Sequence, residues 1–296
     1  MPELIDECPI CKSSSFESFL ICKDYTQSHE NFKIVTCTNC GFKLTNPRPD
    51  IIEVEKYYQS ESYISHSNTN KGLINKLYQL VRNLTLKKKL KLITFLNKNS
   101  SGKVLDIGCG TGMFLKICKE NNWETFGTEP DEKTRIFAIE NSKTEIKQNI
   151  FTDYESQKFD IITMWHVFEH IHDLNKNIER IKELMNTNSF LIIAVPNCDS
   201  YDAKIYKQYW AAYDVPRHLS HFNLKSLNNL INAHGMTLVK TKGMLFDTFY
   251  ISLLSTKYKN NFTNYIKAII IGLLSNIKGL FTKNYSSNIY IVKKNN

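Results

Sequence analysis

The clearest pattern of hydrophobic and polar positions in this chain is the segment 104–112, which reads Val-Leu-Asp-Ile-Gly-Cys-Gly-Thr-Gly. Val104, Leu105 and Ile107 predict a buried strand, and the apolar residues that begin at Met113 predict a helix. The three glycines between these elements remove the Cβ atoms that would keep a ligand away from the backbone. The pattern therefore predicts a ligand-binding turn that faces the free amide groups of the helix.

Helical patterns also occur before this segment, at 53–58 and 73–95. The apolar positions of the second helix are Leu73, Leu77, Leu80, Val81, Leu84, Leu90, Ile93 and Leu96. A stiff Asn-Pro-Arg-Pro segment at 46–49 precedes both helices. We expect the helices to lie over the opening of the ligand site. The loop 63–66 is expected to serve packing more than substrate contact, and 87–89 to form an exposed lysine face.

Asp106, at the end of the predicted strand, indicates the kind of ligand. A carboxylate is poorly placed beside a diphosphate, but it can accept hydrogen bonds or hold a cation. The glycine spacing agrees with this, because the turn reads G-x-G-x-G, whereas the dinucleotide fingerprint is G-x-G-x-x-G. The residues therefore favour a positively charged cofactor over a dinucleotide.

The segment resembles the first motif of class I S-adenosylmethionine-dependent methyltransferases. Segments 123–129, 159–173 and 189–197 are similar to the second strand of that family, to its fourth strand with the active-site loop, and to its fifth strand. The resemblance covers about 100–246 and 286–293. It implies an α/β fold: a Rossmann-like, mostly parallel, seven-stranded sheet with its last strand antiparallel and helices on both faces. The alternative is an α/β domain with an unrelated glycine-rich turn, which four ordered motifs disfavour.

The resemblance also implies S-adenosylmethionine as the cofactor and assigns residues to it. The turn residues that would hold the cofactor are Asp106, Gly108, Cys109, Gly110 and Gly112. Glu129 follows the glycine turn by about twenty residues, which is the spacing of an acid that takes ribose hydroxyls. Asp153 is a further candidate, for the edge of the adenine.

The loop after the fourth predicted strand carries three candidate catalytic residues, His166, Glu169 and His170. It resembles the E-x-x-E-H loop of ubiquinone-biosynthesis O-methyltransferases, with His166 at the position of the first acid. In that group the acids and the histidine are associated with a divalent ion, and the change at His166 weakens the case for a metal here. His166 would instead act as a general base, since an ordinary histidine has a pKa near 6.5. A structural pair, Glu169 and His170, that caps the following helix is the alternative.

A second polar cluster, at 215–222, lies before a predicted helix whose N-cap is Asn223. We expect Arg217, His218 and His221 to face the pocket from the same edge of the sheet. A similar H-L-x-H-F segment recurs in the small-molecule branch of the superfamily. His218 and His221 are therefore candidates for contact with the substrate, and packing or capping is the alternative for both.

The C-terminal part departs from the simplest version of the implied fold. Segments 236–245 and 287–293 resemble the last two strands of the family, yet about forty residues separate them. Within these, 265–281 is strongly apolar, but lysines and an asparagine interrupt it and it is shorter than the roughly twenty apolar residues of a membrane span. A lid over an apolar substrate or a dimer interface is favoured. A helix lying in the membrane surface, as a peripheral contact through 265–281, remains open.

Two Cys-x-x-Cys pairs lie near the start of the chain. Their thiols belong to Cys8, Cys11, Cys37 and Cys40. This spacing lets two thiolates bind one metal from a tight turn, and predicted strands at 16–22 and 32–36 suit a zinc ribbon. We expect structural Zn²⁺, since four protein ligands leave no open position. A redox dithiol pair is disfavoured because no βαβ pattern follows Cys11, and Cys22 and His29 are spare ligands.

These motifs divide the 296 residues into a zinc ribbon at 1–48, a helical cap at 49–98 and a methyltransferase domain at 99–296. The last would carry a helical insertion at about 247–285. The net charge of +9 would suit nucleic acid or an anionic membrane, although lysines on solvated helix faces explain it equally well. The acidic start resembles no secretory signal, so we expect a cytoplasmic protein whose cysteines bind metal or are buried.

Together the motifs predict methyl transfer from S-adenosylmethionine to a small-molecule acceptor, at a hydroxyl of a sugar, a quinone or phenol, or a lipid-like metabolite. An RNA methyltransferase with the ribbon as its RNA-binding module is the first alternative. The chain lacks an N-P-P-Y type loop, and its ribbon lacks interleaved aromatic and basic residues, so a nucleic-acid partner is not favoured. A non-catalytic binding protein is the second alternative, against which the intact Asp106, glycine turn and Glu129 argue.

Overall fold

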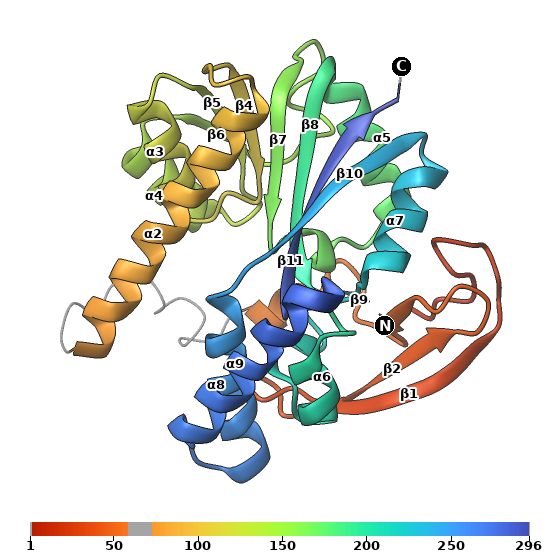
Figure 1. The fold of residues 1–296 in the computed structure, drawn as a ribbon. Coiled ribbons are helices and arrows are strands. Elements are labelled where there is room, and N and C mark those ends of the chain that lie inside the picture. The colour runs from red at the N-terminus through yellow and green to blue at the C-terminus, as the bar shows by residue number, and fades with distance from the viewer. Residues whose placement is uncertain (1, 59–72, 296) are drawn as a thin grey trace.

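The computed structural model describes residues 2–58 and 73–295, in which a layered α/β domain lies beside a smaller β module (Figure 1). The strands are β1 (Phe16–Lys23), β2 (Asn31–Cys37), β3 (Lys43–Thr45), β4 (Lys103–Ile107), β5 (Glu124–Thr128), β6 (Glu145–Lys147), β7 (Phe159–Trp165), β8 (Met185–Pro196), β9 (Ser220–His221), β10 (Met236–Gly243) and β11 (Ser287–Lys294). The α-helices are α2 (Leu73–Leu96), α3 (Met113–Glu120), α4 (Glu132–Ser142), α5 (Leu174–Leu184), α6 (Tyr201–Tyr206), α7 (Leu224–Ala233), α8 (Asp247–Asn260) and α9 (Tyr265–Thr282). Short 3₁₀ helices are η1 (Glu53–Tyr58), η3 (Phe168–His170), η4 (Lys207–Tyr209) and η5 (Ala211–Tyr213).

The central sheet has seven strands in the order β10-β11-β8-β7-β4-β5-β6. Strands β8, β7, β4, β5 and β6 pair in parallel, and β11 runs antiparallel to both of its neighbours. The predicted fold class is thereby confirmed, including the single antiparallel strand. The carboxyl ends of the parallel strands meet at one edge, which is where ligands of open α/β sheets bind.

Helices cover both faces of this sheet (Figure 1). Successive side chains of β4 point to opposite faces, and because its apolar residues lie on both, both faces must be covered. Val104 packs on one face with Ile93 of α2 and Phe114 of α3. Leu105 packs on the other face, in a core that includes Ile178 of α5 and residues of α7. The strand is therefore buried on both sides, and the turn that follows it is held rigidly.

The segment before the central sheet forms the short η1 and the long α2, close to the predicted bounds. Helix α2 runs along the sheet beside α3 and reaches its carboxyl edge, where Lys89 Nζ lies 4.2 Å from the ring centroid of Trp165. The lysine face expected at 87–89 is thus only partly solvent-facing, because Lys89 turns toward the site. The loop 63–66 lies outside the described residues.

The N-terminal module is a four-stranded sheet in the order β1-β2-β3-β9. Its strands β1 and β2 confirm the two predicted strands, whereas β3 and β9 were not predicted. Strand β9 belongs to the segment after β8, and it pairs Ser220 with Leu44 and His221 with Lys43. A strand of two residues leaves no periodicity to detect, so the sequence alone did not reveal that the module is completed by the other domain.

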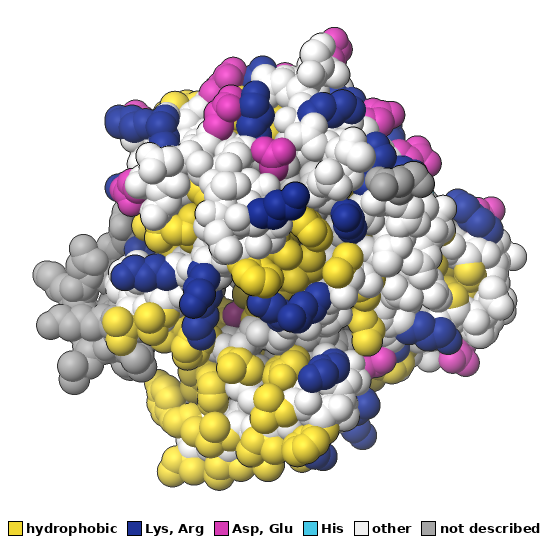
Figure 2. All heavy atoms as spheres, turned by 45° about the horizontal axis from the view of Figure 1, so that its top comes forward, with side chains coloured by type: hydrophobic (Ala, Val, Ile, Leu, Met, Phe, Trp, Pro, Cys, Tyr) yellow, Lys and Arg dark blue, Asp and Glu magenta, His cyan; other side chains and the backbone are white. Residues whose placement is uncertain are grey.

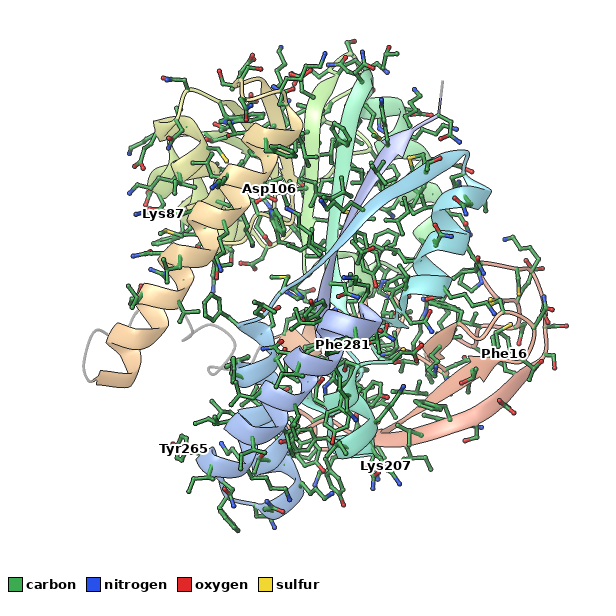
Figure 3. All side chains as sticks on the ribbon, viewed as in Figure 1. Phe16, Lys87, Asp106, Lys207, Tyr265 and Phe281 are labelled. Atoms are coloured by element: carbon green, nitrogen blue, oxygen red, sulfur yellow. The ribbon has the colours of Figure 1, made fainter. Side chains whose placement is uncertain are left out.

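The segment between β10 and β11 forms a helical hairpin of α8 and α9. It lies beyond the carboxyl edge of the sheet and packs against α6 (Figure 1). Tyr265 and Phe281 mark the two ends of α9 (Figure 3). Helix α9 has the length and the composition of a minimal membrane span, but 28% of its 18-residue window is buried inside the protein.

Candidate active site

The glycine turn lies at the carboxyl end of β4 and is packed on one side and open on the other. Gly108 has a φ of +67°, and a Cβ there would lie 2.6 Å from Val167 Cγ2. Gly110 has a φ of +53°, and a Cβ there would meet no atom of the described residues within 4 Å. Because both positions lie in the left-handed region, other residues would be strained there. The open side at Gly110 leaves room for a ligand against the backbone.

Asp106 is the acid directly before this turn, beneath α2 in Figure 3. Its side chain is almost fully buried, and it accepts a hydrogen bond of 2.5 Å from the hydroxyl of Thr163. Burial raises the pKa of Asp106 to about 7, although the Thr163 hydroxyl and the positive charge of Lys89 oppose this shift. A carboxylate in this state gains stability when a cation binds beside it.

Glu129, at the end of β5, is the second acid of the turn. Its Oε2 accepts a hydrogen bond from the Gly110 N–H (3.0 Å), and its Oε1 accepts one from the Asp131 N–H (3.2 Å). Burial raises its pKa, while these backbone donors lower it. Each carboxylate oxygen keeps a lone pair that can accept a further hydrogen bond from a ligand hydroxyl.

Of the other predicted cofactor residues, Cys109 and Gly112 lie in the glycine turn, whereas Asp153 lies on another loop. Cys109 donates its backbone N–H to the carbonyl of Thr128 (2.9 Å), and Gly112 is the N-cap of α3. Both therefore shape the turn through the backbone. Asp153 lies on the loop after β6, where its carboxylate accepts from the Asn149 N–H (3.2 Å).

His166 follows β7 and lies between two carboxylates. Its Nε2 is 2.9 Å from Asp247 Oδ2, and its Nδ1 is 3.4 Å from Glu169 Oε1. Burial would lower the pKa of His166, but the hydrogen bonds to Asp247 and Glu169 raise it to about 10. In this arrangement the imidazole is protonated at neutral pH and is not an available base. The sequence alone does not show this neighbour, because Asp247, at the start of α8, is distant from His166 in the chain.

Glu169 is 1% exposed, and its Oε1 lies 3.4 Å from His166 Nδ1 and 3.9 Å from His218 Nε2. The alternative role of Glu169, as a cap of the following helix, is not observed, because the side chain of Asp173 caps α5. One ligand atom each from Glu169, His170 and His218 lie within 4.8 Å of one another. A buried carboxylate whose charge is met only by imidazole rings can accommodate a cation among these donors.

The orientation of both histidines supports the same conclusion. His170 Nδ1 lies 3.0 Å from the carbonyl of Arg217, and His218 Nδ1 lies 2.9 Å from the carbonyl of Ala212. A carbonyl oxygen only accepts, so Nδ1 of His218 carries a hydrogen. His170 Nδ1 also lies 2.8 Å from the hydroxyl of Tyr58, which can accept or donate. Burial and the charge of His218 lower the pKa of His170 to about 4, so this ring is neutral. Neutral imidazoles that donate Nδ1–H to a backbone carbonyl are typical metal ligands.

Arg217 and His221 do not join this group, although both were expected to face the pocket. Arg217 is 1% exposed and forms ion pairs with Asp24 (3.0 Å) and Asp214 (2.7 Å). His221 Nε2 lies 3.0 Å from the hydroxyl of Thr45 in β3. Both side chains therefore tie the loop to the N-terminal module. Their polarity predicted a pocket, but their partners are in another module of the chain.

A groove of about 460 Å³ opens between α2 and the segment that follows β10. Five lysines line it: Lys88, Lys89, Lys91, Lys240 and Lys242. Its apolar walls include Leu92, Met244 and Phe246, and Asp247 lies among the lining residues. Figure 2 displays a hollow on this face, with lysines and hydrophobic side chains around it. The groove thus combines a cationic and apolar lining with one acid, Asp247, whose carboxylate contacts His166.

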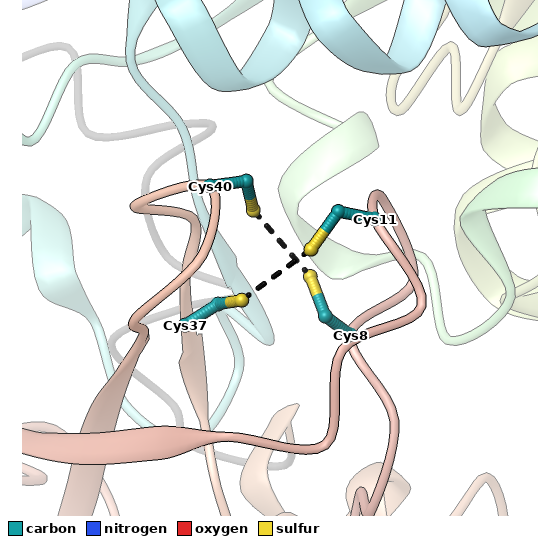
Figure 4. Close-up of side chains that lie close together, drawn as sticks. All are labelled: Cys8, Cys11, Cys37 and Cys40. Carbon is teal, nitrogen blue, oxygen red and sulfur yellow. Dashed lines mark hydrogen bonds between the residues drawn. The ribbon is translucent and has the colours of Figure 1, made fainter.

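The four predicted zinc ligands converge in the N-terminal module (Figure 4). The sulfurs of Cys8 and Cys40 are 3.6 Å apart, and those of Cys11 and Cys37 are 3.5 Å apart. Tetrahedral zinc with Zn–S bonds of about 2.3 Å requires sulfur separations of roughly 3.8 Å, so the group fits the ion. Burial raises the pKa of Cys40 to about 11, and only a bound cation would make a thiolate favourable there.

Comparisons with known proteins agree with this geometry. A family profile described as a methyltransferase domain matches residues 79–241, more than half of the chain. A ubiquinone biosynthesis O-methyltransferase of Haemophilus ducreyi is 30% identical over 108 residues, which cover 32% of this chain and 45% of the relative. An uncharacterized methyltransferase of Staphylococcus carnosus is 28% identical over 98 residues, 33% of this chain and 47% of the relative. The chain spans about half the length of these curated relatives.

Solved structures share the fold. Magnesium protoporphyrin IX methyltransferase from Synechocystis, with bound SAH, has a TM-score of 0.55 and 14% identity, over 83% of this chain and 100% of that one. The plantazolicin methyltransferase in complex with SAH has a TM-score of 0.53 and 15% identity, over 81% and 93%. At these identities the likeness concerns the arrangement of the backbone alone.

Proposed function

The chain belongs to the methyltransferase-domain family, and on this premise we propose that it transfers the methyl group of S-adenosylmethionine to a small-molecule acceptor. The observation that carries this proposal is the pair of acids on either side of the open glycine turn. Asp106 is a buried carboxylate with a pKa of about 7, and a sulfonium cation beside it would restore its charge. Glu129 has acceptor capacity for the two hydroxyls of a ribose.

The remaining cofactor contacts follow from the chemistry of the turn. The backbone at Gly110 would lie against the nucleoside, because the space where its Cβ would stand is open. Gly108, Cys109 and Gly112 are assigned to the cofactor because they shape the same turn. Lys89 is the cation whose charge acts on Asp106, and it suits the carboxylate at the amino-acid end of the cofactor. Asp153 is assigned to the edge of the adenine.

The reaction needs alignment and the removal of one proton. The methyl carbon leaves the sulfonium sulfur, which keeps the electron pair of the broken C–S bond, and forms a bond to the acceptor oxygen. The hydroxyl proton then needs a base. We assign it to Asp247, which lines the groove, while the protonated His166 holds that carboxylate in place. This assignment makes the reaction an O-methylation and gives His166 a positioning role.

Glu169, His170 and His218 would hold a divalent cation. One oxygen and two imidazole nitrogens form a donor set that many divalent metals accept. When bound, such an ion supplies positive charge beside the acceptor and lowers the pKa of a hydroxyl. The buried carboxylate of Glu169, with ligand atoms of His170 and His218 within 4.8 Å, supports this assignment. His221 has no part in the proposed chemistry, because its partner is Thr45.

The groove supports an acceptor that is apolar in its body and acidic at one end. Five lysines and a single acid among its lining residues attract a carboxylate or a phosphate, and the apolar walls suit a ring system or an aliphatic chain. A sugar without either feature fits less well. RNA is the alternative for a lysine-rich surface, and a salt-sensitive affinity for RNA would favour it.

The four cysteines of the N-terminal module are assigned to a structural zinc ion. Their four sulfurs leave no open coordination position, so the ion would stabilise the module and take no part in the reaction. We place the protein in the cytoplasm, where a reducing environment keeps these thiols available.

Calorimetry with S-adenosylmethionine, followed by incubation with extracts of the source cells, tests the proposal. We expect binding to a single site and a product one methylene heavier than its precursor, formed only when protein and cofactor are both present. A chain without affinity for the cofactor at millimolar concentration would contradict the proposal. A chain that binds the cofactor and methylates nothing would support the non-catalytic alternative.

A further inference from the structure

Helix α9 of the hairpin buries mostly small residues and exposes most of its large apolar residues. The buried face of α9 consists of Ala268, Ile271, Gly272, Ser275 and Gly279. The exposed large side chains of the same helix are Tyr265, Ile266, Ile269, Ile270, Leu273, Leu274, Ile277, Leu280 and Phe281. Phe281 is 83% exposed and Ile266 is 74% exposed. A helix on the surface of a water-soluble protein normally turns its large apolar side chains toward the core and its polar side chains toward the solvent.

Specific contacts fix the helix in this orientation. Ser275 donates a hydrogen bond to the buried Asp202 (2.7 Å), and Thr248 of α8 donates one to Asn276 (3.0 Å). A Cβ on Gly272 would lie 2.8 Å from Phe249, so α8 and α9 are in close contact at this point. Rotation of α9 to bury its isoleucines would break these bonds and force large side chains into this contact. The apolar face is therefore a permanent surface of the fold.

The charge around this face has one sign. Five lysines of the hairpin are exposed: Lys257, Lys259, Lys267, Lys278 and Lys283. The sequence contains no aspartate or glutamate after Asp247. A second copy of the chain docked on this face would bring like charges together, whereas a surface of anionic lipid headgroups complements them. Figure 2 displays the hydrophobic band with lysines beside it.

We propose that the hairpin docks on a membrane rich in anionic phospholipids, with α9 lying in the plane of the interface. At about 1.5 Å per residue its 18 residues cover roughly 27 Å of that surface. The long lysine side chains at its edges reach the headgroups while their methylenes follow the apolar face. A spanning orientation is disfavoured because the opposite face of α9 binds Asp202 and packs on the protein.

Co-sedimentation of the full chain with vesicles tests this inference, and it needs neither cofactor nor acceptor. Vesicles of phosphatidylglycerol and phosphatidylcholine should bind the protein at least tenfold more tightly than pure phosphatidylcholine. The triple variant Ile266→Gln/Ile270→Gln/Ile277→Gln should lose at least tenfold in affinity. The double variant Ile136→Gln/Ile139→Gln, on exposed positions of α4, is the matched control and should bind like the unmodified chain.

Three results would overturn the proposal. Equal binding of neutral and anionic vesicles would remove the role of the lysines. Self-association in sedimentation, abolished by the triple variant and without vesicle binding, would identify the face as a contact between copies. Bound protein that resists extraction at alkaline pH would indicate a spanning helix. Vesicle binding is measured without cofactor or acceptor. A negative result for the membrane proposal therefore does not contradict the proposed methyl transfer, and the two proposals are tested separately.

Discussion

His166 Nε2 and Asp247 Oδ2 lie 2.9 Å apart, although 81 residues separate them in the chain. His166 follows the last residue of β7, and Asp247 is the first residue of α8. The hairpin inserted between the last two strands thus contributes a charged group to the edge where the strands end. The pair also lies next to the buried carboxylate of Glu169.

The first prediction concerns Asp247→Asn, which removes the proposed base and preserves its size. We expect kcat to fall by roughly a hundred- to ten-thousandfold, because general base catalysis contributes factors of this order. The affinity for S-adenosylmethionine should change by less than about twofold, since Asp247 is assigned to the acceptor. Steady-state kinetics and calorimetry measure the two quantities. Glu120→Gln, on the exposed end of α3, is the control, and an unaltered kcat in Asp247→Asn would exclude the role.

The second prediction concerns pH and Asp106. Burial raises its pKa in the folded chain to about 7 from 3.8, so the folded state is favoured while this group is protonated. This contribution is complete below about pH 4 and is lost as the pH rises through about 7. Asp106→Asn does not titrate, so at pH 8 the cofactor-free variant should be more stable than the unmodified chain by about 2 to 4 kcal/mol.

The same variant should lose most of its cofactor affinity, because a neutral amide does not attract a sulfonium. Thermal unfolding at pH 4 and at pH 8, without and with S-adenosylmethionine, measures both effects. The difference in stability should vanish at the lower pH. A variant that is destabilised at pH 8, or that binds the cofactor like the unmodified chain, would contradict this account of Asp106.

The third prediction concerns the divalent cation. Addition of Mn²⁺ to the zinc-loaded chain should raise its melting temperature, since an ion that binds only the folded state stabilises it. His218→Gln should abolish this shift, because it removes one of the three donor groups. His234→Gln is the matched control, as this ring lies against Asn175 and Glu179, apart from the cluster. An identical shift in both variants would place the ion elsewhere.

The fourth prediction concerns the thiol cluster. Cys11→Ser should remove the bound zinc and lower the melting temperature by roughly 10 °C or more, since metal affinity is folding free energy in such small modules. Cys22→Ala is the control for loss of a thiol in the same module, because Cys22 is buried apart from the other four. Metal analysis by mass spectrometry accompanies the unfolding curves. Retention of one zinc per chain by Cys11→Ser would require another ligand set.

The fifth prediction concerns the lysines of the groove. Lys240→Gln/Lys242→Gln should raise KM for an acidic acceptor by about tenfold and leave kcat nearly unchanged. The reason is that these lysines would stabilise the bound acceptor equally in the ground state and in the transition state. Salt should then affect KM less than in the unmodified chain. Lys204→Gln/Lys225→Gln removes two exposed lysines outside the groove and serves as the control. Equal effects of both pairs would indicate nothing more than a change in net charge.

The sequence predicts the central sheet well, because its signals are local. The strand, turn and helix around Gly110 occupy one continuous segment, and β7 and β8 each contain an apolar run. Strand β6, which reads Glu-Ile-Lys, has no such run and was not predicted. The Cys-x-x-Cys pairs are local too, and their convergence follows from the hairpin of β1 and β2. The cap formed by Asn223, which accepts from the Ser226 N–H, was likewise evident from residue type.

The site was harder to predict, since its geometry depends on distant partners. His166 and His221 carry the same side chain, yet one lies between two carboxylates and the other against Thr45. Arg217 looked like a pocket residue, and its charge is neutralised by Asp24, which precedes it by 193 residues. No periodicity or motif records such pairs. Asp247 was missed for the same reason, because it follows a strand in a segment without any recognised motif.

Strand β9 gives the N-terminal module an importance beyond its size. Thr45 of β3 donates its hydroxyl to the carbonyl of His218 (2.8 Å), and the N–H of Leu219 reaches the carbonyl of Glu169 (2.9 Å). The N-terminal module therefore supports the segment that carries His218 and contacts Glu169. We expect loss of zinc from the proposed four-cysteine site to loosen this segment together with the module, so a methyltransferase domain transplanted without residues 1–48 should bind a divalent cation poorly.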